Sequence, residues 1–595
     1  MAYMEREPVA GHSNIPDSRG INFFSSDPSF GALLRAHLGE NLYRPLEADL
    51  RRLGQLASDE LDTWASSADK NPPSLQHRTR RGEALQRIDK HPAYVALERA
   101  AYSELGLAAM SHRADAPPPL IKYALTFLFV QAEFGLCCPV SMTDSLTRTL
   151  RKYGSAELLQ RYLPHLTSLD FDTLYQGAMF MTEQAAGSDV ARIQTLATYY
   201  AAAQKSAQEG APDDAVHSEG EWRLTGDKWF CSNPDADLAM VLARVAGAPE
   251  GIHGLGLFLL PKTLPDGTRN RYRIVRLKDK MGSRSMASGE IVLEGAQAYL
   301  VGEIGRGFHQ MADMINMSRL SNGVRAAGLM RRAVTEALHI ARHREAFGRK
   351  LIDMPLMQRQ LLKMMLPAEQ ARTMFLQIAL CLARADQGDQ DAKKRVRILT
   401  PLIKFRACRD ARRVTGDAME IRGGTGYIEE WSDARLVRDA HLGSIWEGTS
   451  NIVALDIARA VKREGALPPL RRYLQEMMAG SALPSRSAKL LNGLLDKACI
   501  ALSGAAERQE DEVVRQAGSA LYHVCTAVFM AVEAMQLAPD FRRLALSHLV
   551  ARHKLLPYDP LQPQVAGASG ELLRAVVSER PMSLDEAMQL LHGDA

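Results

Sequence analysis

The spacing of apolar residues changes twice along this chain, and this change limits the folds that it can adopt. Leucines recur at helical spacing from Ala32 to Ala65, and further helices are predicted up to about residue 165. Between about 176 and 300, short runs such as GAMFMTE, DLAMVLARV and GEIVLEG are typical of strands. Helical spacing returns at Phe308 and continues almost to the end of the sequence. The order is helices, strands, helices, which predicts an α+β protein.

The predicted domains follow these changes of period. In chain order they are an extended N-terminal arm (1–30), an N-terminal helical domain (31–175), a β domain (176–300), a C-terminal helical bundle (301–463) and a helical extension (464–595). The β domain is expected to be all antiparallel, with about seven strands, a hairpin turn at Thr225-Gly226-Asp227 and a polar surface loop over Gln204–Gly220. The other predicted helices cover Tyr94–His112, Leu120–Cys138, Ser145–Leu163, 308–343, 355–387, 394–421, 451–463, 468–479, 485–503, 510–537 and 541–555.

Composition and charge argue against several classes of protein. The 595 residues include 73 Lys/Arg and 69 Asp/Glu, and a net charge of +4 gives no support for a general nucleic-acid or membrane-surface role. The most apolar stretch, Leu120–Met142, contains Lys122, Glu133 and Pro139, so a buried core helix is predicted rather than a membrane span. Seven cysteines without CxxC or metal-ligand spacing, and a beginning unlike a signal peptide, predict a reduced, cytoplasmic protein without a metal site.

Five unusual sequences lie where predicted elements meet. They are TEQAAGSD at 182–189, GDKWFCSN at 226–233, REAFG at 344–348, GGTGY at 423–427 and WEGTS at 446–450. Each has a purely structural interpretation: a polar exit from a strand, a helix C-terminal cap at the glycines, or an N-terminal cap at Thr449 to Asn451. Arg344 alone could be a surface charge at a helix end. Taken singly, the structural interpretation is the simpler one for each sequence.

Taken together and in this order, the five sequences resemble the acyl-CoA dehydrogenase family of flavoproteins over residues 85–463. The corresponding family patterns are TExxxGSD, GxKxWITN, RxxFG, GGxGY and (Y/W)EGTS. The chain is most similar to the AidB-like branch of that family, through His91-Pro92-Ala93-Tyr94, the segment 138–143 and the segment 264–280. The resemblance implies an N-terminal helical domain, a central antiparallel β-barrel or sandwich domain and a C-terminal four-helix bundle, followed here by the helical extension.

The same resemblance implies FAD as the cofactor. The flavin would be bound by Met181, Thr182, Gly187, Ser188, Phe230 and Ser232, with Phe230 stacking on the ring where the family usually has Trp. Thr449 and Asn451 would contact the nucleotide part. Arg344 would neutralise the pyrophosphate, and it would reach across from a neighbouring subunit together with Phe347, Gln358, Gly423 and Gly424. A homo-oligomer, either a tetramer or a dimer, is therefore expected.

Glu447 lies at the position of the family's catalytic base. In the α,β-dehydrogenation of an acyl-CoA thioester, a carboxylate removes an α-proton while a hydride leaves the β-carbon for flavin N5. The resemblance implies that the Glu447 N–H and a flavin hydroxyl stabilise the thioester oxygen. The helix that starts after Glu447 favours its ionised form, whereas burial disfavours it, and burial is expected to dominate once substrate has expelled water. Gly448 and Arg319 would contact the substrate, Arg319 near its CoA end.

Two other functions stay open. A DNA-associated, alkylation-protective flavoprotein of AidB type would need a basic face on the extension, but residues 461–595 hold fifteen basic and fifteen acidic residues. The local patch Arg542, Arg543, Arg552 and Lys554 is more often a solvated face, so DNA is the weaker expectation. A flavin monooxygenase on the same fold typically lacks the glutamate base. The partners that the resemblance implies are an acyl-CoA substrate and an electron-transfer flavoprotein as acceptor, without a membrane.

Overall fold

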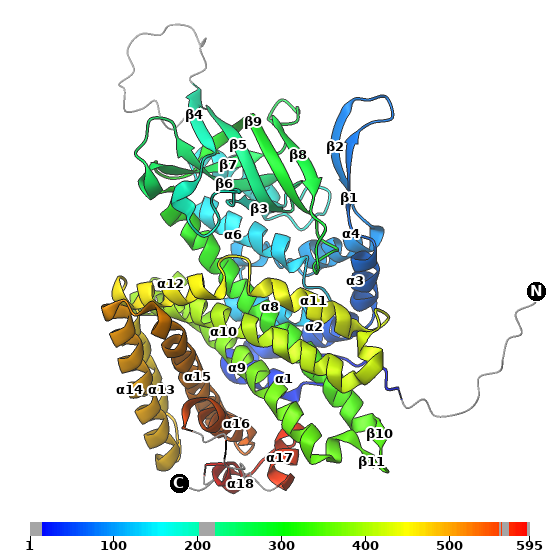
Figure 1. The fold of residues 1–595 in the computed structure, drawn as a ribbon, viewed down its shortest axis with the longest axis vertical. Coiled ribbons are helices and arrows are strands. Elements are labelled where there is room, and N and C mark those ends of the chain that lie inside the picture. Colours follow the sequence, from blue (N-terminus) through cyan, green and yellow to red (C-terminus); the bar gives the residue numbers. More distant parts are fainter. Residues whose placement is uncertain (1–14, 201–220, 558–560, 562–569, 592–595) are drawn as a thin grey trace, which may run out of the picture.

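The computed structural model describes residues 15–200, 221–557, 561 and 570–591. The β domain lies at one end of the long axis, the helices of the N-terminal domain and of the bundle lie beneath it, and the extension packs beside the bundle (Figure 1). This arrangement confirms the predicted α+β fold class. Residues 1–14 of the predicted arm and the predicted loop Gln204–Gly220 lie outside the described residues.

The N-terminal helical domain has more breaks than its period predicts. Its elements are α1 (Pro28–Leu38), α2 (Glu40–Ser58), α3 (Glu60–Lys70), β1 (Ser74–Arg78), β2 (Ala84–Asp89), α4 (Pro92–Arg99), α5 (Pro119–Phe129), α6 (Cys137–Tyr153) and α7 (Ala156–Leu166). The single helix predicted from Ala32 to Ala65 is divided at Gly39, whose φ of 72° separates α1 from α2, and again at Asp59. The three helices predicted between residues 94 and 163 are likewise each divided among two or more elements.

A buried side chain explains the largest of these breaks. The helix predicted over Leu120–Cys138 stops at Phe129, and α6 starts only at Cys137. Between them, the carboxylate of Glu133 accepts the backbone N–H of Leu136 (3.1 Å) and the hydroxyl of Ser285 (2.9 Å). Glu133, one of the residues that interrupt the apolar stretch, therefore lies in a turn inside the protein.

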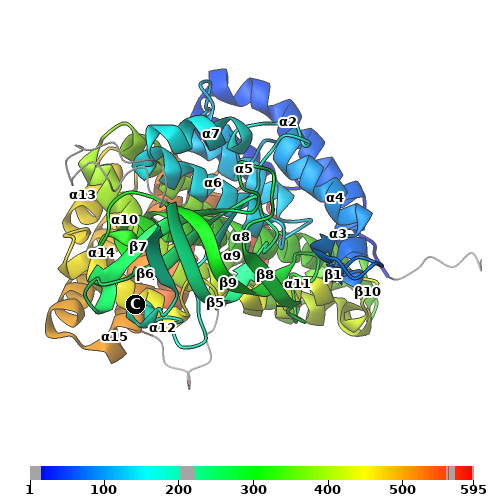
Figure 2. The ribbon, with the colours of Figure 1, turned by 90° about the horizontal axis from the view of Figure 1, so that it is seen from above.

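The β1–β2 hairpin does not follow from the period, because its strands carry few apolar residues. Ile88 and Leu75 pack against the core of the β domain, and the side-chain oxygen of Gln86 accepts the N–H of Ile274 at 2.7 Å. These contacts hold the hairpin beside the β domain, on the side opposite to the extension (Figure 2).

The β domain is a closed barrel with two additional strands. Its strands are β3 (Gly177–Phe180), β4 (Leu196–Tyr200), β5 (Glu221–Ser232), β6 (Leu238–Val245), β7 (Leu255–Pro261), β8 (Tyr272–Leu277) and β9 (Ser288–Leu300). The order β6-β4-β5-β9-β7 closes through pairing of β7 with β6, while β3 adds to β6 and β8 adds to β9. Large apolar residues such as Trp222 and Phe258, whose ring centroids are 5.3 Å apart, fill the interior.

Two expectations for this domain were wrong. The sheet is mixed, because β6 runs parallel to both β3 and β4. Long connections separate these strands in sequence and let the chain return in the same direction. Thr225-Gly226-Asp227 is not a hairpin turn but lies within β5, where Gly226 lets the strand pass close to Thr195: a Cβ there would lie 2.8 Å from the Thr195 Cα.

The C-terminal bundle matches its predicted helices closely. It consists of α8 (Gly307–His343), β10 (Glu345–Ala346), β11 (Arg349–Lys350), α9 (Pro355–Asp386), α10 (Gln390–Arg422), α11 (Ser432–Gly443) and α12 (Ser450–Lys462). Of these, α11 is an additional helix that the period does not predict. The long helices α8, α9 and α10 pack on one another, and α5 and α6 pack on α8. The N-terminal domain and the bundle therefore share one core.

The extension adds helices to one side of the bundle (Figure 1). They are α13 (Leu467–Ala479), α14 (Ser485–Arg508), α15 (Asp511–Gln536), α16 (Arg542–Val550), α17 (Gly570–Val577) and α18 (Leu584–Gln589). Within the described residues, α15 is the one helix whose length and composition would suit a membrane span, but 83% of its apolar window is buried in the protein. Its apolar surface is thus accounted for by packing.

Arg542 and Arg543 do not form the predicted surface patch. They are 1% and 2% exposed, and Arg543 forms ion pairs with Glu369 (2.8 Å) and Glu533. Arg542 donates to the Val576 carbonyl oxygen at 3.0 Å. These two arginines face inward because α16 packs on α9 and α15, so their charges join the extension to the bundle.

Candidate active site

Glu447 lies in the short connection between α11 and α12 and has an unusual backbone conformation. Its φ is +49°, in the left-handed region that residues other than glycine rarely adopt, and Gly448 follows with φ +102°. Arg319 Nε donates to the Glu447 carbonyl oxygen (3.1 Å). Lys404 Nζ donates to the carbonyl oxygens of Gly448 (3.2 Å) and Gly443 (2.7 Å). Two buried cations therefore hold the strained turn that carries the Glu447 side chain.

The Glu447 carboxylate is bound by two residues of α8. Ser318 donates its hydroxyl to Oε1 at 2.6 Å, and Asn322 donates its side-chain amide to Oε2. Because these donors are four residues apart, they lie on the same face of the helix. Trp446 Nε1 donates to Asn322 Oδ1 at 2.6 Å and so orients the amide. The half-buried carboxylate is thus held at both oxygens.

Arg319 makes its polar contacts inside the protein. Its guanidinium is buried and forms an ion pair with Asp456 (2.7 Å), besides its bond to the Glu447 carbonyl oxygen. Burial lowers the pKa of Arg319, and Asp456 opposes that effect. Its charge is therefore balanced inside the protein by Asp456, and its predicted contact with the substrate stays a prediction. Arg459 is the exposed partner of Asp456 (3.3 Å).

A buried ion pair joins the first two motifs. Lys228 of β5 is completely buried and lies 2.7 Å from Glu183 Oε1, which also accepts the hydroxyl of Thr195 (2.6 Å). Burial raises the pKa of Glu183, but Lys228 and the hydrogen-bond donors outweigh it, and the pKa falls below its usual value. Trp229 N–H donates to the Thr182 carbonyl oxygen at 2.8 Å. The loop after β3 and the strand β5 are therefore fixed to one another.

These two segments carry the first set of predicted flavin contacts. Met181, Thr182 and Ser232 are half-buried, whereas Gly187, Ser188 and Phe230 are exposed. Phe230 presents 57% of its surface to solvent. The ammonium of Lys278 lies 3.6 Å from the Trp229 ring centroid and 4.6 Å from that of Phe230. Of the two adjacent rings, Phe230 is the better placed to stack on a flat cofactor.

Cys138, at the start of α6, is a buried thiol that interacts with Ser232 and with the charge of Glu447. Burial raises the pKa of the Cys138 thiol to about 11. The charge of Arg325 and a hydrogen bond with Ser232 oppose the rise, whereas the charge of Glu447 adds to it. The Cys138 thiol is thus hydrogen-bonded to Ser232 on β5 and lies within the electrostatic influence of Glu447.

The residues predicted to reach across from a neighbouring subunit lie at the other end of α8. Arg344 follows α8 and donates Nη1 to the Arg422 carbonyl oxygen at 3.0 Å, while Phe347 is 97% exposed. Twenty-six residues of α8 separate Arg344 from Ser318, which corresponds to about 39 Å of helix. This set therefore lies far from Glu447 of the same chain.

The Arg344 end of the bundle contains a small cavity. Its volume is about 190 Å³, and it is lined by Ile15, Pro16, Ile340, Arg344, Arg422, Gly424 and Thr425. Gly423 ends α10 with φ +76°, and a Cβ there would lie 3.4 Å from Arg344 Nη1. Gly423 is thus a helix cap, as the simpler interpretation has it, and also gives the guanidinium room. Gln358 is different, because its side chain is buried and donates to the Ile352 carbonyl oxygen at 3.0 Å.

These residues fit FAD. A guanidinium beside a glycine turn suits a pyrophosphate, and an exposed aromatic ring suits the flavin. Thr449 and Asn451, at the start of α12, are both exposed. Thr449 has the N-cap position, yet within the described chain its side chain makes no capping hydrogen bond. Its hydroxyl can therefore serve a ligand.

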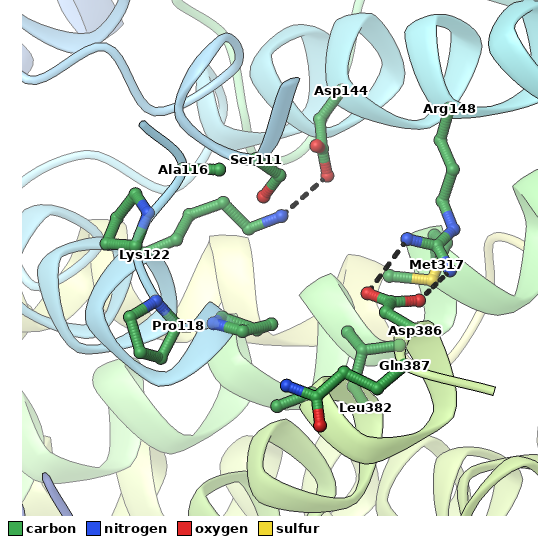
Figure 3. Close-up of a pocket in the computed structure, with 13 residues that line it drawn as sticks. Ser111, Ala116, Pro118, Lys122, Asp144, Arg148, Met317, Leu382, Asp386 and Gln387 are labelled. Carbon is green, nitrogen blue, oxygen red and sulfur yellow. Dashed lines mark hydrogen bonds and ion pairs between the residues drawn. The ribbon is translucent and has the colours of Figure 1, made fainter. Parts of the chain in front are cut away.

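A second cavity, of about 370 Å³, lies between α5, α6, α8 and the end of α9 (Figure 3). Lys122 forms an ion pair with Asp144 (2.9 Å) and Arg148 forms one with Asp386 in its wall. Met317, which also lines it, precedes Ser318 and so faces a different side of α8. Because the four charges are paired with each other, we assign no ligand to this cavity. No group of three His, Cys, Asp or Glu suited to a metal ion occurs within the ranges that the structure describes.

Ser318, Asn322 and Trp446 were not among the predicted site residues. Trp446 stands in the WEGTS motif, directly before Glu447, which is a usable indication. Ser318 and Asn322 share the helical spacing of many other polar pairs, so the sequence alone does not distinguish them.

Family models match almost the whole main body of the chain. They are described as the adaptive response protein AidB N-terminal domain (residues 14–173), the acyl-CoA dehydrogenase middle domain (178–296) and the acyl-CoA dehydrogenase C-terminal domain (305–462). The chain is 33% identical over 428 residues to the putative acyl-CoA dehydrogenase AidB of Escherichia coli, covering 70% of this chain and 74% of that protein. It is 29% identical over 484 residues to acyl-CoA dehydrogenase family member 11 of Caenorhabditis elegans, covering 79% and 75%.

Two solved structures are similar over most of the chain. The crystal structure of Caenorhabditis elegans ACDH-11 in complex with C11-CoA has a TM-score of 0.84 at 26% identity, covering 94% of this chain and 95% of that one. The apo-form of Bd2924 has a TM-score of 0.75 at 30% identity, covering 86% and 99%.

Proposed function

The chain belongs to the acyl-CoA dehydrogenase family, and from this premise we propose that it is an FAD-dependent enzyme that oxidises the Cα–Cβ bond of an acyl-CoA thioester. One observation carries the proposal: the Glu447 carboxylate is held at both oxygens by Ser318 and Asn322, on a turn with a strained backbone. The similar ACDH-11 structure holds an acyl-CoA, which supports a thioester ligand for this chain.

In this reaction, Glu447 takes the α-proton while the Cα–Cβ double bond forms. An α-proton of a thioester is a weak acid, so the base must be directed at it before the reaction begins. The hydrogen bonds from Ser318 and Asn322 direct the carboxylate, and the bonds from Arg319 and Lys404 fix the backbone beneath it. FAD, when bound, supplies the acceptor for the hydride that leaves the β-carbon.

The proposal includes a cofactor shared between two copies of the chain, in a dimer or tetramer. Arg344, Gly423 and Gly424 lie about 39 Å of helix away from the Glu447 end, so they serve the site of a neighbouring subunit. The apolar side chains around them are exposed in the single chain, as expected for an interface: Phe347 (97%), Leu356 (83%) and Tyr427 (80%).

We further propose a cytoplasmic enzyme that passes its electrons to an electron-transfer flavoprotein. The acceptor follows from the family resemblance. The location rests on the seven cysteines, which are all free and buried, as expected of thiols in a reducing compartment.

The test compares the purified protein with Glu447→Gln. Anaerobic titration with short, branched, aromatic and long acyl-CoAs is expected to bleach the flavin absorbance of the wild-type protein for at least one class. Glu447→Gln is expected to keep its FAD and to lose the bleaching, because an amide cannot take the proton. Equal bleaching in both proteins would remove Glu447 from the mechanism, and bleaching by no acyl-CoA would remove the proposed reaction.

Binding of nucleic acid is a second candidate that one observation favours. Basic residues gather on the β1–β2 hairpin and β8. The segments that contain them, 74–90 and 269–280, hold eleven Lys/Arg and three Asp/Glu, whereas the whole chain has a net charge of only +4. Arg80 and Arg81 are exposed at the hairpin tip, whereas the arginines Arg542 and Arg543 of the extension are buried. Gel shifts over a range of salt should show Arg80→Glu/Arg81→Glu binding DNA more weakly than wild type, with a smaller salt dependence. Equal binding by both proteins would argue against this face.

A further inference from the structure

The cavity at the Arg344 end of the bundle has one wall that comes from the N-terminal arm. Arg344 and Gly424, which line it, belong to the bundle, whereas Ile15 and Pro16 belong to the arm. Neither Ile15 nor Pro16 stands in one of the five motifs, and neither was among the predicted site residues. Because the two sets are far apart in sequence, only the folded chain brings them together.

The arm is anchored beside this cavity through Arg422. Arg422 Nη1 donates to the Pro16 carbonyl oxygen at 3.4 Å, and Nη2 donates to the Glu336 carboxylate at 2.6 Å. Glu336 also accepts the hydroxyl of Ser18, and all three of these side chains are buried. Further along the arm, Phe23 is 1% exposed and packs in the core. The arm therefore has a defined place at this end of α8.

Two guanidinium groups line the cavity, and they differ in how their charges are balanced. Arg422 forms ion pairs with Glu336 (2.6 Å) and Asp433 (2.5 Å). Arg344 donates to the Arg422 carbonyl oxygen at 3.0 Å, and within the ranges that the structure describes it forms no ion pair with an acidic side chain. The charge of Arg344 can therefore serve an anion, whereas that of Arg422 is used to hold the arm.

The lining suits one end of a nucleotide better than a whole cofactor. The volume of about 190 Å³ is smaller than the about 300–1,000 Å³ of cavities that enclose a complete small ligand. Ile15, Pro16 and Ile340 offer apolar surface to a flat base, and the Arg344 guanidinium suits a phosphate. A base that carries a phosphate is the chemistry of the adenylate end of FAD.

We propose that Ile15 and Pro16 are binding residues for the adenylate end of the FAD that a neighbouring subunit holds beside its own Glu447. This inference rests on the proposed function, in which the Arg344 end of one subunit completes the cofactor site of the next. The arm then has two effects. Its apolar side chains cover the base, and the Pro16 carbonyl oxygen holds Arg422, whose own carbonyl oxygen orients Arg344.

The test uses ADP and FMN as probes, because ADP carries the adenylate end without the flavin and FMN carries the flavin without the adenylate. Calorimetric titration of the flavin-free, full-length protein measures the affinity for each. Ile15→Asp places a carboxylate beside the phosphate, so ADP should bind about tenfold more weakly or worse, whereas FMN affinity should stay within about twofold. Ile15→Leu keeps the wall apolar and should bind ADP like wild type. Release of FAD from the holoenzyme, followed by flavin fluorescence, should be faster in Ile15→Asp alone.

Arg19→Ala is the matched control. Arg19 lies on the same arm, pairs with Asp17 (2.6 Å) and does not line the cavity. Its replacement changes the net charge as much as Ile15→Asp does, and it should leave both affinities unchanged. Unchanged ADP binding in Ile15→Asp, or an equal loss for ADP and FMN, would overturn the inference. If only ADP binding weakens but no acyl-CoA bleaches the wild-type flavin, the inference stands and the proposed reaction fails.

Discussion

The hydroxyl oxygen of Ser318 lies 2.6 Å from Oε1 of Glu447, although 129 positions separate the two residues in the chain. Asn322, one helical turn later, binds the other oxygen, so one face of α8 holds the whole carboxylate. Each hydrogen bond to a charged group contributes about 1.5–3 kcal/mol, so Ser318→Ala and Asn322→Leu should each lower the flavin-reduction rate about tenfold or more. Rapid-mixing measurement of flavin reduction checks this expectation.

A matched control separates orientation from general damage. Ser321→Ala removes a hydroxyl from the same turn of α8 without a bond to Glu447 and should leave the rate unchanged. FAD content should be equal in all these variants. Ser318 and Asn322 bind the Glu447 carboxylate and are not among the predicted cofactor contacts. Full rates in both Ser318→Ala and Asn322→Leu would mean that the carboxylate orients itself.

The separation of Glu447 and Arg344 along α8 gives a complementation test. If each cofactor takes Glu447 from one subunit and Arg344 from its neighbour, Glu447→Gln and Arg344→Glu should each be inactive alone. In a mixed oligomer, one kind of site combines intact Glu447 with intact Arg344. Co-expression with two affinity tags should therefore recover acyl-CoA-dependent flavin reduction, in roughly half of the sites of a mixed dimer.

Pairing Glu447→Gln with Asn322→Leu is the negative control, because both changes lie on the same side of the shared site and should not complement. Absence of recovery in the Glu447→Gln and Arg344→Glu pair, in oligomers that carry both tags, would mean that Arg344 does not serve a neighbouring site.

Helices with an unbroken period could be predicted almost to the residue, whereas elements defined by buried polar contacts could not. The segment 308–343 matches α8 because its apolar period continues for ten turns. Leu120–Cys138 has a similar composition but is broken by Glu133, whose partner Ser285 is 152 positions away. Nothing local in the sequence shows that Glu133 will accept that hydrogen bond.

The same contrast between local sequence signals and distant buried contacts applies to the candidate site. Glu447 could be located because it stands within a motif, and its local turn then follows from Gly448. The burial of Arg543 could not be predicted, since it depends on Glu369, 174 positions earlier in the chain. A basic pair such as Arg542-Arg543 is indistinguishable from a solvated face until its partners are known. The roles of the predicted cofactor residues stay predictions until the variants above are measured.

The ion pair between Lys228 and Glu183 should matter for both stability and the cofactor. Lys228→Met leaves Glu183 buried and unpaired, which should cost about 3–5 kcal/mol of unfolding free energy. The loop that carries Gly187 and Ser188 should also loosen, so the ratio of flavin to protein absorbance should fall. Denaturant titration and absorbance spectra check both effects.

The double variant Lys228→Met/Glu183→Leu tests whether the cost comes from the unpaired charge. It should be more stable than Lys228→Met alone, because no buried carboxylate is left. An additive loss in the double variant would show that the two side chains act independently.

Glu533 should make the attachment of the extension depend on acidity. Burial alone would raise its pKa, but Arg543, His37 and Thr373 outweigh burial and lower the pKa to about 2. A carboxyl group with a lowered pKa in the folded protein stabilises it fully above its usual value of 4.5, and this contribution is lost as the pH falls towards 2. The unfolding free energy of the wild-type protein should therefore decline between these two values.

Glu533→Gln removes the titrating group and leaves Arg543 with Glu369 as its remaining acid. This variant should be less stable than wild type at pH 7, by about 3–5 kcal/mol, and its unfolding free energy should decline less as the pH falls. Glu512→Gln, on the exposed first turn of the same helix, changes the net charge equally and should follow the wild-type curve. Parallel acid curves for wild type and Glu533→Gln in denaturant titrations would show that this carboxylate does not couple the extension to the bundle.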